Sequence, residues 1–351
     1  MPHSARPTTA AVPAAPRLSA LALVLLLVLP LALLLAGCGD TTPPEPAGPA
    51  QAQPGQTRTP AVEASAEAVA RNAREGLRCP APPADALPAG VPVDDVVGVR
   101  PGMTWAEAWQ RVLCSHPMLV AAPDPDNRFR LPPSDPPVRQ GFEARAAEAR
   151  VHKTGRQIVE EMQADMMARG NNKARRPVAP GQARWYVGTM GMPGDERVTH
   201  VLREEWYAAD ALPPMDSVLQ ALVAKYGEPM RRTGGGASRS GRPVNVELTW
   251  VHDPAGRRVG AREPLASQCG LHPSPDAGVN LSEACGVVVS AQVQPLPDNP
   301  GLAQALRVGS VDQARGYARV AATGLALQQR QAERRAREVQ EAGRQAKTPT
   351  L

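Results

Sequence analysis

The side chains best suited to acid–base or metal chemistry are scattered along this chain. Two glutamate pairs, 160–161 and 204–205, are adjacent, and neighbours in a helix or strand point apart. Five histidines downstream of the N-terminal region lack a metal-ligating partner at helical spacing: His116, His152, His200, His252 and His272. We therefore expect no catalytic residues, no metal site and no cofactor.

Two loops approach known functional motifs without completing them. The stretch GGGASRSG has Ser240 where a Gly-x-Ser-x-Gly nucleophile elbow needs its last glycine, and it lacks the Gly-Lys-Ser/Thr ending of a phosphate loop. Asp124, Asp126 and Asp135 match positions of a calcium-loop template, but Arg128 and Phe129 occupy positions that need a ligand and a glycine. Both segments are predicted to be ordinary solvated loops.

The N-terminus has the pattern of a secretory signal. Residues 1–17 carry Arg6 and Arg17 and no acid, and residues 18–37 are nearly continuous Leu, Ala and Val. The apolar run is almost long enough to span a bilayer, so a transmembrane anchor is the alternative. Pro30 interrupts the run and no basic stop-transfer cluster follows, which favours a signal peptide over residues 1–37.

The end of this run, Leu35-Ala36-Gly37-Cys38, resembles a bacterial lipobox. The resemblance implies that the Cys38 thiol accepts a diacylglyceryl group and that cleavage leaves Cys38 as the first residue of a palmitate-type lipoprotein. Two or more acyl chains hold a protein stably on a membrane. Gly39, where such proteins carry Asp for inner-membrane retention, favours the periplasmic side of the outer membrane, with the inner membrane as the alternative.

The remaining four cysteines, Cys79, Cys114, Cys269 and Cys285, form an even set in an exported chain and predict two disulfides. Sequence allows three pairings. We favour Cys79–Cys114 and Cys269–Cys285 because each closes a short local loop, and the second loop would be worth roughly 3 kcal/mol.

Composition divides the chain into four parts. They are the signal peptide over residues 1–37, a lipidated cysteine and Pro/Ala-rich tether over 38–76, an α+β periplasmic domain over 77–300, and a C-terminal helix with a basic tail over 301–351. Loss of residues 1–37 removes two arginines and no acid, so the formal charge falls from +5 to +3. This charge does not indicate nucleic-acid binding.

The central part alternates helical and strand patterns, which predicts an antiparallel sheet packed by helices. Thr104 and Glu107 form a capping box before a helix with Trp105 and Trp109 on its core face. Period-two patterns predict a hairpin over residues 184–206 and strands over 244–253 and from 285. Further expectations are a helix over 63–76, a short strand at Val96–Val99 and a helix capped by Asp216.

Two longer helices are also expected. Residues 139–169 are rich in Ala, Glu, Arg and Met, and Val159, Met162 and Met166 form a stripe that we interpret as core, with a binding surface as the alternative. Residues 300–347 are predicted to form one helix whose polar, basic end is solvated, or else contacts anionic headgroups or peptidoglycan.

Residues 101–118 and 213–230 echo one another. Both contain proline, methionine, a capping residue, a helix and a Pro-Met ending at the same spacing without a gap. The echo suggests two related helix-and-sheet units. The alternative is that capped helices in general share this order of residues.

The segment GVRPGMTWAEAWQRV resembles the entry of the small SmpA/OmlA lipoproteins of the outer-membrane β-barrel assembly machinery, through Gly98, Gly102, Met103 and Thr104. In that family two helices pack on a three-stranded antiparallel sheet, so the resemblance implies an α+β module of similar build. It does not imply the same partner, because this chain is much longer and carries a Pro-rich loop and four cysteines that are foreign to the pattern.

The leading functional hypothesis is a non-enzymatic, lipid-anchored envelope lipoprotein that binds an envelope protein or cell-wall partner or serves a structural role. The alternatives are an exported cell-wall hydrolase and a periplasmic hydrolase inhibitor that inserts the loop 269–285 into its target.

Overall fold

A computed structural model describes residues 62–79, 91–124, 129–169 and 178–346, which form ten strands and six helices. The helices are α1 (Ala66–Ala73), α2 (Trp105–Ser115), α3 (Gly155–Arg169), α4 (Met215–Tyr226), α5 (Leu265–Gln268) and α6 (Gln313–Gln345). The strands are β1 (Val62–Ala64), β2 (Leu119–Pro123), β3 (Gly141–Ala146), β4 (Arg150–Val151), β5 (Ala183–Met190), β6 (Arg197–Trp206), β7 (Arg231–Gly234), β8 (Val246–Val251), β9 (Val287–Leu296) and β10 (Asn299–Asp312).

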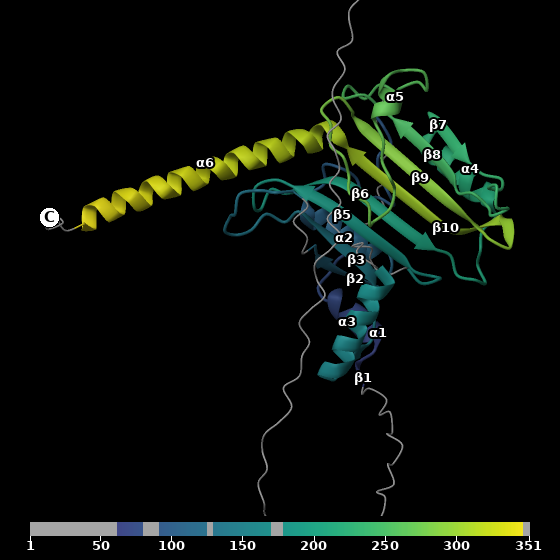
Figure 1. Cartoon of the computed structure of the whole chain (residues 1–351), viewed down its shortest axis with the longest axis horizontal. Coiled ribbons are helices and arrows are strands. Elements are labelled where there is room, and N and C mark those ends of the chain that lie inside the picture. The colour runs from purple at the N-terminus through teal and green to yellow at the C-terminus, as the bar shows by residue number, and fades with distance from the viewer. Residues whose placement is uncertain (1–61, 80–90, 125–128, 170–177, 347–351) are drawn as a thin grey trace, which may run out of the picture. The chain divides into compact units, whose positions relative to one another are not determined.

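One eight-stranded antiparallel sheet dominates the fold, in the order β2-β3-β5-β6-β10-β9-β8-β7 (Figure 1). The short strands β1 and β4 pair separately. The α+β class, with an antiparallel sheet packed by helices and a long C-terminal helix, is therefore confirmed.

The helices α2 and α4 pack on the same face of the sheet, called here the helix face. Alternate strand residues point to this face because side chains in a strand have a period of two. They form one apolar core with both helices, which includes Phe142, Trp185, Val187, Leu248, Trp250, Val289 and Ala291. The predicted core face of α2 is confirmed: Trp105 and Val112 are buried, and Trp109 is partly buried against them. The predicted capping box of Thr104 and Glu107 is also present.

The two halves of the sheet have the same topology. In the first half α2 is followed by β2, β3, β5 and β6, and in the second half α4 is followed by β7, β8, β9 and β10. Each half is a helix and a four-stranded meander that begins at a sheet edge, and the two last strands, β6 and β10, pair at the centre.

Backbone contacts at the start of α2 and α4 are also equivalent in the two halves. Thr104, before α2, bridges to the start of β6 at Arg197, while Pro214, before α4, bridges to Leu302 in β10. When the buried faces of the two helices are matched, Trp105 corresponds to Met215. The gapless echo in the sequence instead matches Trp105 with Ser217, two positions later. The shared topology supports the hypothesis of two related units.

Both favoured disulfides are present in the structure. Cys79 and Cys114 lie with their Cα atoms 5.5 Å apart, and Cys269 and Cys285 with theirs 5.7 Å apart. The first ties the chain after α1 to the end of α2, and the second closes the loop between β8 and β9.

Several local predictions were wrong. Residues 139–169 are not one helix, since β3 and β4 precede α3, and residues 299–312 are the strand β10 rather than the start of α6. In both places pairing with a neighbouring strand outweighs a helix-favouring composition. The strand predicted at Val96–Val99 is a tight turn, and Asp216 lies in the first turn of α4, which has no side-chain cap. The stripe of Val159, Met162 and Met166 is exposed, so its interpretation as core was also wrong.

Other boundaries also move. The helix expected over 63–76 is confirmed as α1, and with β1 it places described structure from Val62 onward inside the segment assigned to the tether. The rest of that tether and the signal peptide lie outside the described residues.

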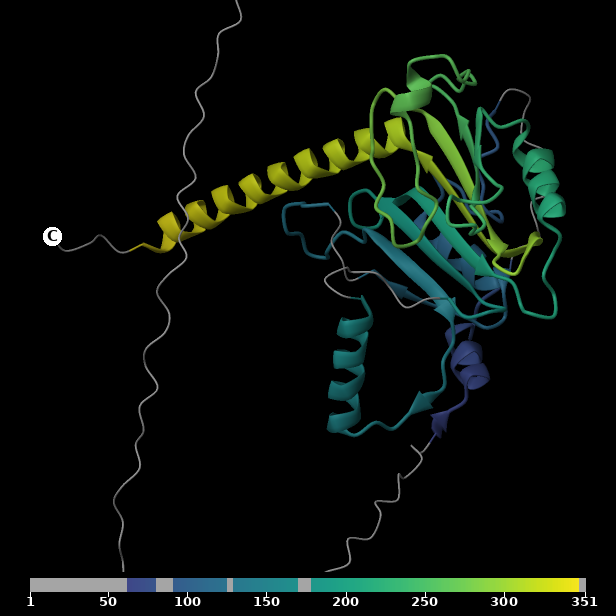
Figure 2. The same cartoon turned by 45° about the vertical axis from the view of Figure 1, so that its right-hand side comes forward.

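The start of α6 is fixed against the loop that the second disulfide closes. The side chain of Asp312 accepts a hydrogen bond from the backbone of Arg315 (3.1 Å), and Gln313 donates to the carbonyl of Gly270 (3.1 Å). A Cβ on Gly316 would lie 2.8 Å from Cδ2 of Leu281, so a larger residue there would force that leucine side chain to move. After Leu327 the described part of α6 is exposed except for the half-buried Gln331, and the helix runs clear of the sheet (Figure 2).

Across the opposite face of the sheet runs a row of polar side chains. Its members stand directly opposite one another on five successive strands from β5 to β8 and are called here the Glu204 row: Arg184, Glu204, Arg307, Gln292 and Glu247. Each one contacts the next, at 2.8 Å, 2.6 Å, 2.8 Å and 2.8 Å in turn. Asp276, from the loop closed by the second disulfide, also pairs with Arg184 at 2.8 Å.

Glu204 lies between the two arginines of this row, with its side chain 4% exposed. Burial raises the pKa of the Glu204 carboxyl, but the guanidinium groups of Arg307 and Arg184 outweigh burial and hold the pKa below its ordinary value. A lowered pKa means that the ionised carboxylate contributes folding stability above the unfolded-state pKa, and this contribution is lost as the pH falls through the folded-state pKa.

We predict that Glu204→Gln lowers the free energy of unfolding by about 3 kcal/mol at neutral pH, because it leaves buried guanidinium groups without their carboxylate. The control is Glu205→Gln, which breaks a more exposed pair with Arg203 and should cost less than about 1 kcal/mol. Urea unfolding measures both, and the difference between wild type and Glu204→Gln should shrink in acid. Equal losses for the two variants would contradict a central role for Glu204.

Candidate functional site

The structure separates the residues that the sequence analysis singled out. Cys38 lies outside the described residues, and the other four cysteines form the two disulfides. Among the described residues no group of three His, Cys, Asp or Glu side chains could hold a metal ion. His200 and His252 are buried in the sheet, far from one another in the strand order, and make no shared site.

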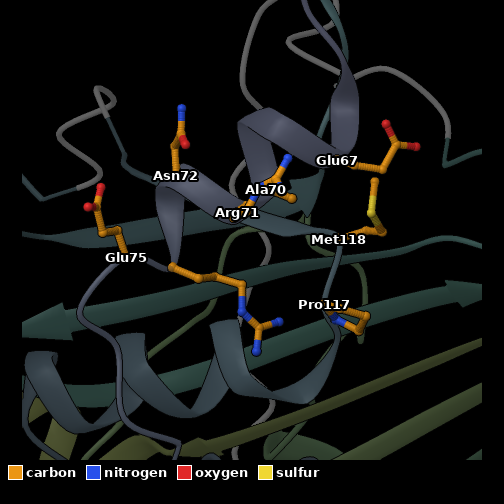
Figure 3. A pocket seen from close by; sticks show the side chains of 8 residues that line it. Glu67, Ala70, Arg71, Asn72, Glu75, Pro117 and Met118 are labelled. Carbon is orange, nitrogen blue, oxygen red and sulfur yellow. The ribbon is translucent and has the colours of Figure 1, made fainter.

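One hollow measures about 680 Å³ and lies between α1 and the chain after α2. Charged side chains from α1 line it together with Pro117 and Met118, and in Figure 3 Glu67, Asn72 and Glu75 point outward without converging. Arg74 is engaged with the carbonyl of His116 at 3.1 Å. A ligand site has polar groups that converge on an apolar wall, and this hollow does not.

A second hollow, called here the α4 groove, has that character. It measures about 370 Å³ and lies between α4, the turn at residues 96–97 and the helix face of the sheet. Its wall is mainly apolar and includes Val96, Val97, Tyr207, Pro213, Val218, Ala221, Leu222, Leu306 and Val308. The sequence brings these residues together because α4 follows β6 directly and packs over β10 and β9.

Two ion pairs lie at the edge of the α4 groove. Lys225 pairs with Asp95 at 2.7 Å, and Arg203 pairs with Glu205 at 2.8 Å. Asp95 also accepts a hydrogen bond from the backbone of Gly98 (2.8 Å), so it fastens the turn to α4. An apolar floor inside a charged rim is the usual anatomy of a protein-binding surface.

The turn at the lip of the groove is strained. Val96 and Val99 exchange backbone hydrogen bonds of 2.8 Å and 3.0 Å, and the two residues between them have positive φ, 48° at Val97 and 79° at Gly98. This is the type I′ geometry that favours Asn-Gly, and a β-branched residue with positive φ is a genuine outlier. Val97 is nevertheless 51% exposed beside the groove. Strained backbone of this kind clusters at active sites, ligand clamps and switch regions, so the turn is a candidate part of a binding site.

Titratable groups near the groove are shifted by burial. Burial raises the pKa of Asp94 to about 6, and one of its carboxyl oxygens has no hydrogen-bond partner among the described residues. Burial, helped by Glu205, raises the pKa of Tyr207 to about 12, and burial also raises the pKa of Tyr226. Both phenols therefore stay protonated, and Tyr226 donates to the carbonyl of Asp95 at 2.8 Å.

The loop 269–285, which the inhibitor hypothesis requires to enter a target, lies against its own sheet. Asp276 pairs with the buried Arg184, and Pro273 and Leu271 approach Gly309 closely. Cys269 and Cys285 belong to a small core with Val288 and Val311. The loop and its disulfide thus cover the opposite face of the sheet.

Sequence reasoning missed the α4 groove. Its lining comes from four separate segments, and no motif marks a cavity that forms only when they pack. One signal was available: the pair Val97-Gly98 after Asp94-Asp95 indicates a turn, and the valine is out of place there.

Comparison with known proteins gave no match to a family model, to a curated protein or to a solved structure. None of the helices in the described part of the chain combines the length and apolar character needed to cross a membrane.

We predict that Val97→Asn raises the free energy of unfolding by about 1 kcal/mol, because asparagine tolerates positive φ and completes an Asn-Gly type I′ turn. Val91→Asn is the control, since Val91 is similarly exposed (47%) and its φ is not positive. Thermal or urea unfolding checks both. A destabilised Val97→Asn would show that the valine is not strained.

Proposed function

We propose that this protein is a lipid-anchored lipoprotein of the bacterial envelope, held by Cys38, whose duplicated α+β domain binds an envelope protein without catalysing a reaction. The outer membrane is the proposed location. The observation that carries the proposal is the use of the cysteines. Four of the five are paired inside the folded domain, and the fifth is the lipobox cysteine.

The pairing supports the proposal in two ways. Stable disulfides belong to oxidising compartments, which fits export through the N-terminal signal. The pairing also leaves Cys38 as the one thiol for acylation, at the end of an apolar run and before a segment rich in Pro and Ala.

The α4 groove supports a binding role for the domain. An apolar wall with a rim of ion pairs suits the apolar side chains of a protein segment, and Val97 supplies an exposed apolar contact at the lip. The hydrolase and inhibitor alternatives receive no comparable observation. The inhibitor hypothesis depends on a loop that is engaged with its own sheet.

The anchor is tested by intact mass measurement on protein extracted from membranes. The expected mass is that of the chain from Cys38 onward with acyl groups added, and Cys38→Ser should abolish both the acyl mass and the cleavage. A chain that retains its leader, or an unmodified thiol at position 38, would contradict the proposal.

The groove is tested by a photo-crosslinking residue at Ala221, which lines it, with Gln220 as the matched control on the exposed side of α4. In envelopes, position 221 should give a discrete protein adduct that position 220 does not give. Val97→Asn, which alters the lip, should weaken the adduct at 221. Identical adducts at both positions, or none at 221, would contradict a binding role for the groove.

A further inference from the structure

The strand β7 lies at one edge of the eight-stranded sheet. It pairs with β8 on one side, and no described strand pairs with it on the other (Figure 1). All four of its residues, 231–234, are exposed. The strand at the other edge, β2, is instead packed against α1 and α2. An edge strand of this kind presents unpaired backbone N–H and C=O groups to solvent, so β7 can accept a further strand.

The chain from β7 to the start of β8, residues 231–246, forms a hairpin that is called here the basic arm. Backbone pairing continues beyond β7 towards its tip, where the N–H of Ser238 donates to the carbonyl of Arg242 (2.7 Å). Gly234 has a positive φ of 79°, and a Cβ there would clash with the carbonyl oxygen of Asn245. Glycine is therefore required at the point where the regular ladder of β7 and β8 ends.

The basic arm contains no acidic residue and carries four arginines: Arg231, Arg232, Arg239 and Arg242. All four are exposed, and none of their guanidinium groups forms an ion pair within the described part of the chain. The next turn along the chain differs, since Arg257 there pairs with Asp253 (3.0 Å) and Glu263 (2.8 Å). Glu247, on the neighbouring strand, accepts from Gln292 (2.8 Å). The arm therefore carries a positive charge that the fold does not neutralise.

The two arginines of β7 lie on opposite faces of the sheet edge, because successive side chains in a strand alternate. Arg232 stands opposite Leu248, which belongs to the apolar core of the helix face. Arg231 stands opposite Thr249 on the other face. A strand added to β7 would place its own side chains beside both arginines, at the distance of cross-strand neighbours. Two successive acidic residues in that strand would meet both arginines at once.

The same arginines oppose pairing with a second copy of this chain. In an edge-to-edge contact, β7 of one copy would meet β7 of the other, and the arginines of both would lie close together. Like charges on paired strands are destabilising, whereas opposite charges stabilise the pair and fix its register. The charge of the edge therefore selects an acidic strand and rejects a copy of itself.

We propose that β7 is a docking edge for an extended acidic segment of a partner protein, which adds to the sheet as a further strand. Backbone hydrogen bonds along β7 supply affinity, and Arg231 and Arg232 select consecutive acidic residues in the segment. Arg239 and Arg242 steer the segment towards the edge by their charge. None of the residues that line the α4 groove belongs to the basic arm, so this surface requires neither the groove nor the lipid anchor.

The test measures by calorimetry how the full mature protein binds a short synthetic peptide in which β-branched residues flank two successive glutamates. Arg231→Gln combined with Arg232→Gln should weaken binding about tenfold, because two ion pairs are lost. The matched control is Arg335→Gln combined with Arg337→Gln, which removes the same charge from exposed positions on α6 and should leave binding nearly unchanged. Hydrogen exchange at the amides of residues 231–234 should slow when the peptide is bound, because the added strand covers them.

Two further peptides separate strand addition from attraction by charge alone. One has glutamine in place of both glutamates and should bind about tenfold more weakly. The other keeps the charge but is interrupted by proline, which lacks an N–H, and should not protect residues 231–234. Equal binding of the proline peptide would assign the arm to polyanions in general and overturn the inference.

Three other results would also overturn it: equal binding of the glutamine peptide, equal losses in the two double variants, or no protection of residues 231–234 by the acidic peptide. Val97→Asn, which alters the lip of the α4 groove, should leave binding of the acidic peptide unchanged. Failure of strand addition therefore leaves the proposed role of the groove intact, and failure of the groove leaves this inference intact.

Discussion

The buried carboxylate of Glu204 constrains the register of the central strands of the sheet. It lies on β6, one of the two strands that join the halves of the sheet, and pairs with Arg184 on one side and Arg307 on the other. A slip of one residue in either pairing would turn the carboxylate toward the helix face and away from both Arg184 and Arg307. Burial of a charge adds little net stability, but it penalises every wrong register. The polar row thereby specifies the alignment that the apolar core then stabilises.

This alignment explains why the two faces of the sheet are covered differently. The helix face is apolar and is covered by α2 and α4, which occupy equivalent places in the two halves. The opposite face carries charges, so its cover must supply polar partners. The loop closed by Cys269 and Cys285 does so through Asp276. The second disulfide therefore closes a loop that supplies Asp276 to one end of the polar row.

Much of the architecture could be predicted from local patterns. The hairpin β5–β6, the capped helix α2, the strand β8 and both disulfides were predicted because alternation, capping residues and short cysteine spacings act over neighbouring residues. The errors at β3 and β10 arise where a helical composition meets strand partners that the local pattern does not show: β3 pairs with β5, and β10 pairs with β6 as well as with the adjacent β9. Leu302 and Leu306 have helical spacing, yet both belong to a strand paired with β9. Similarly, the α4 groove joins segments that sequence cannot place side by side.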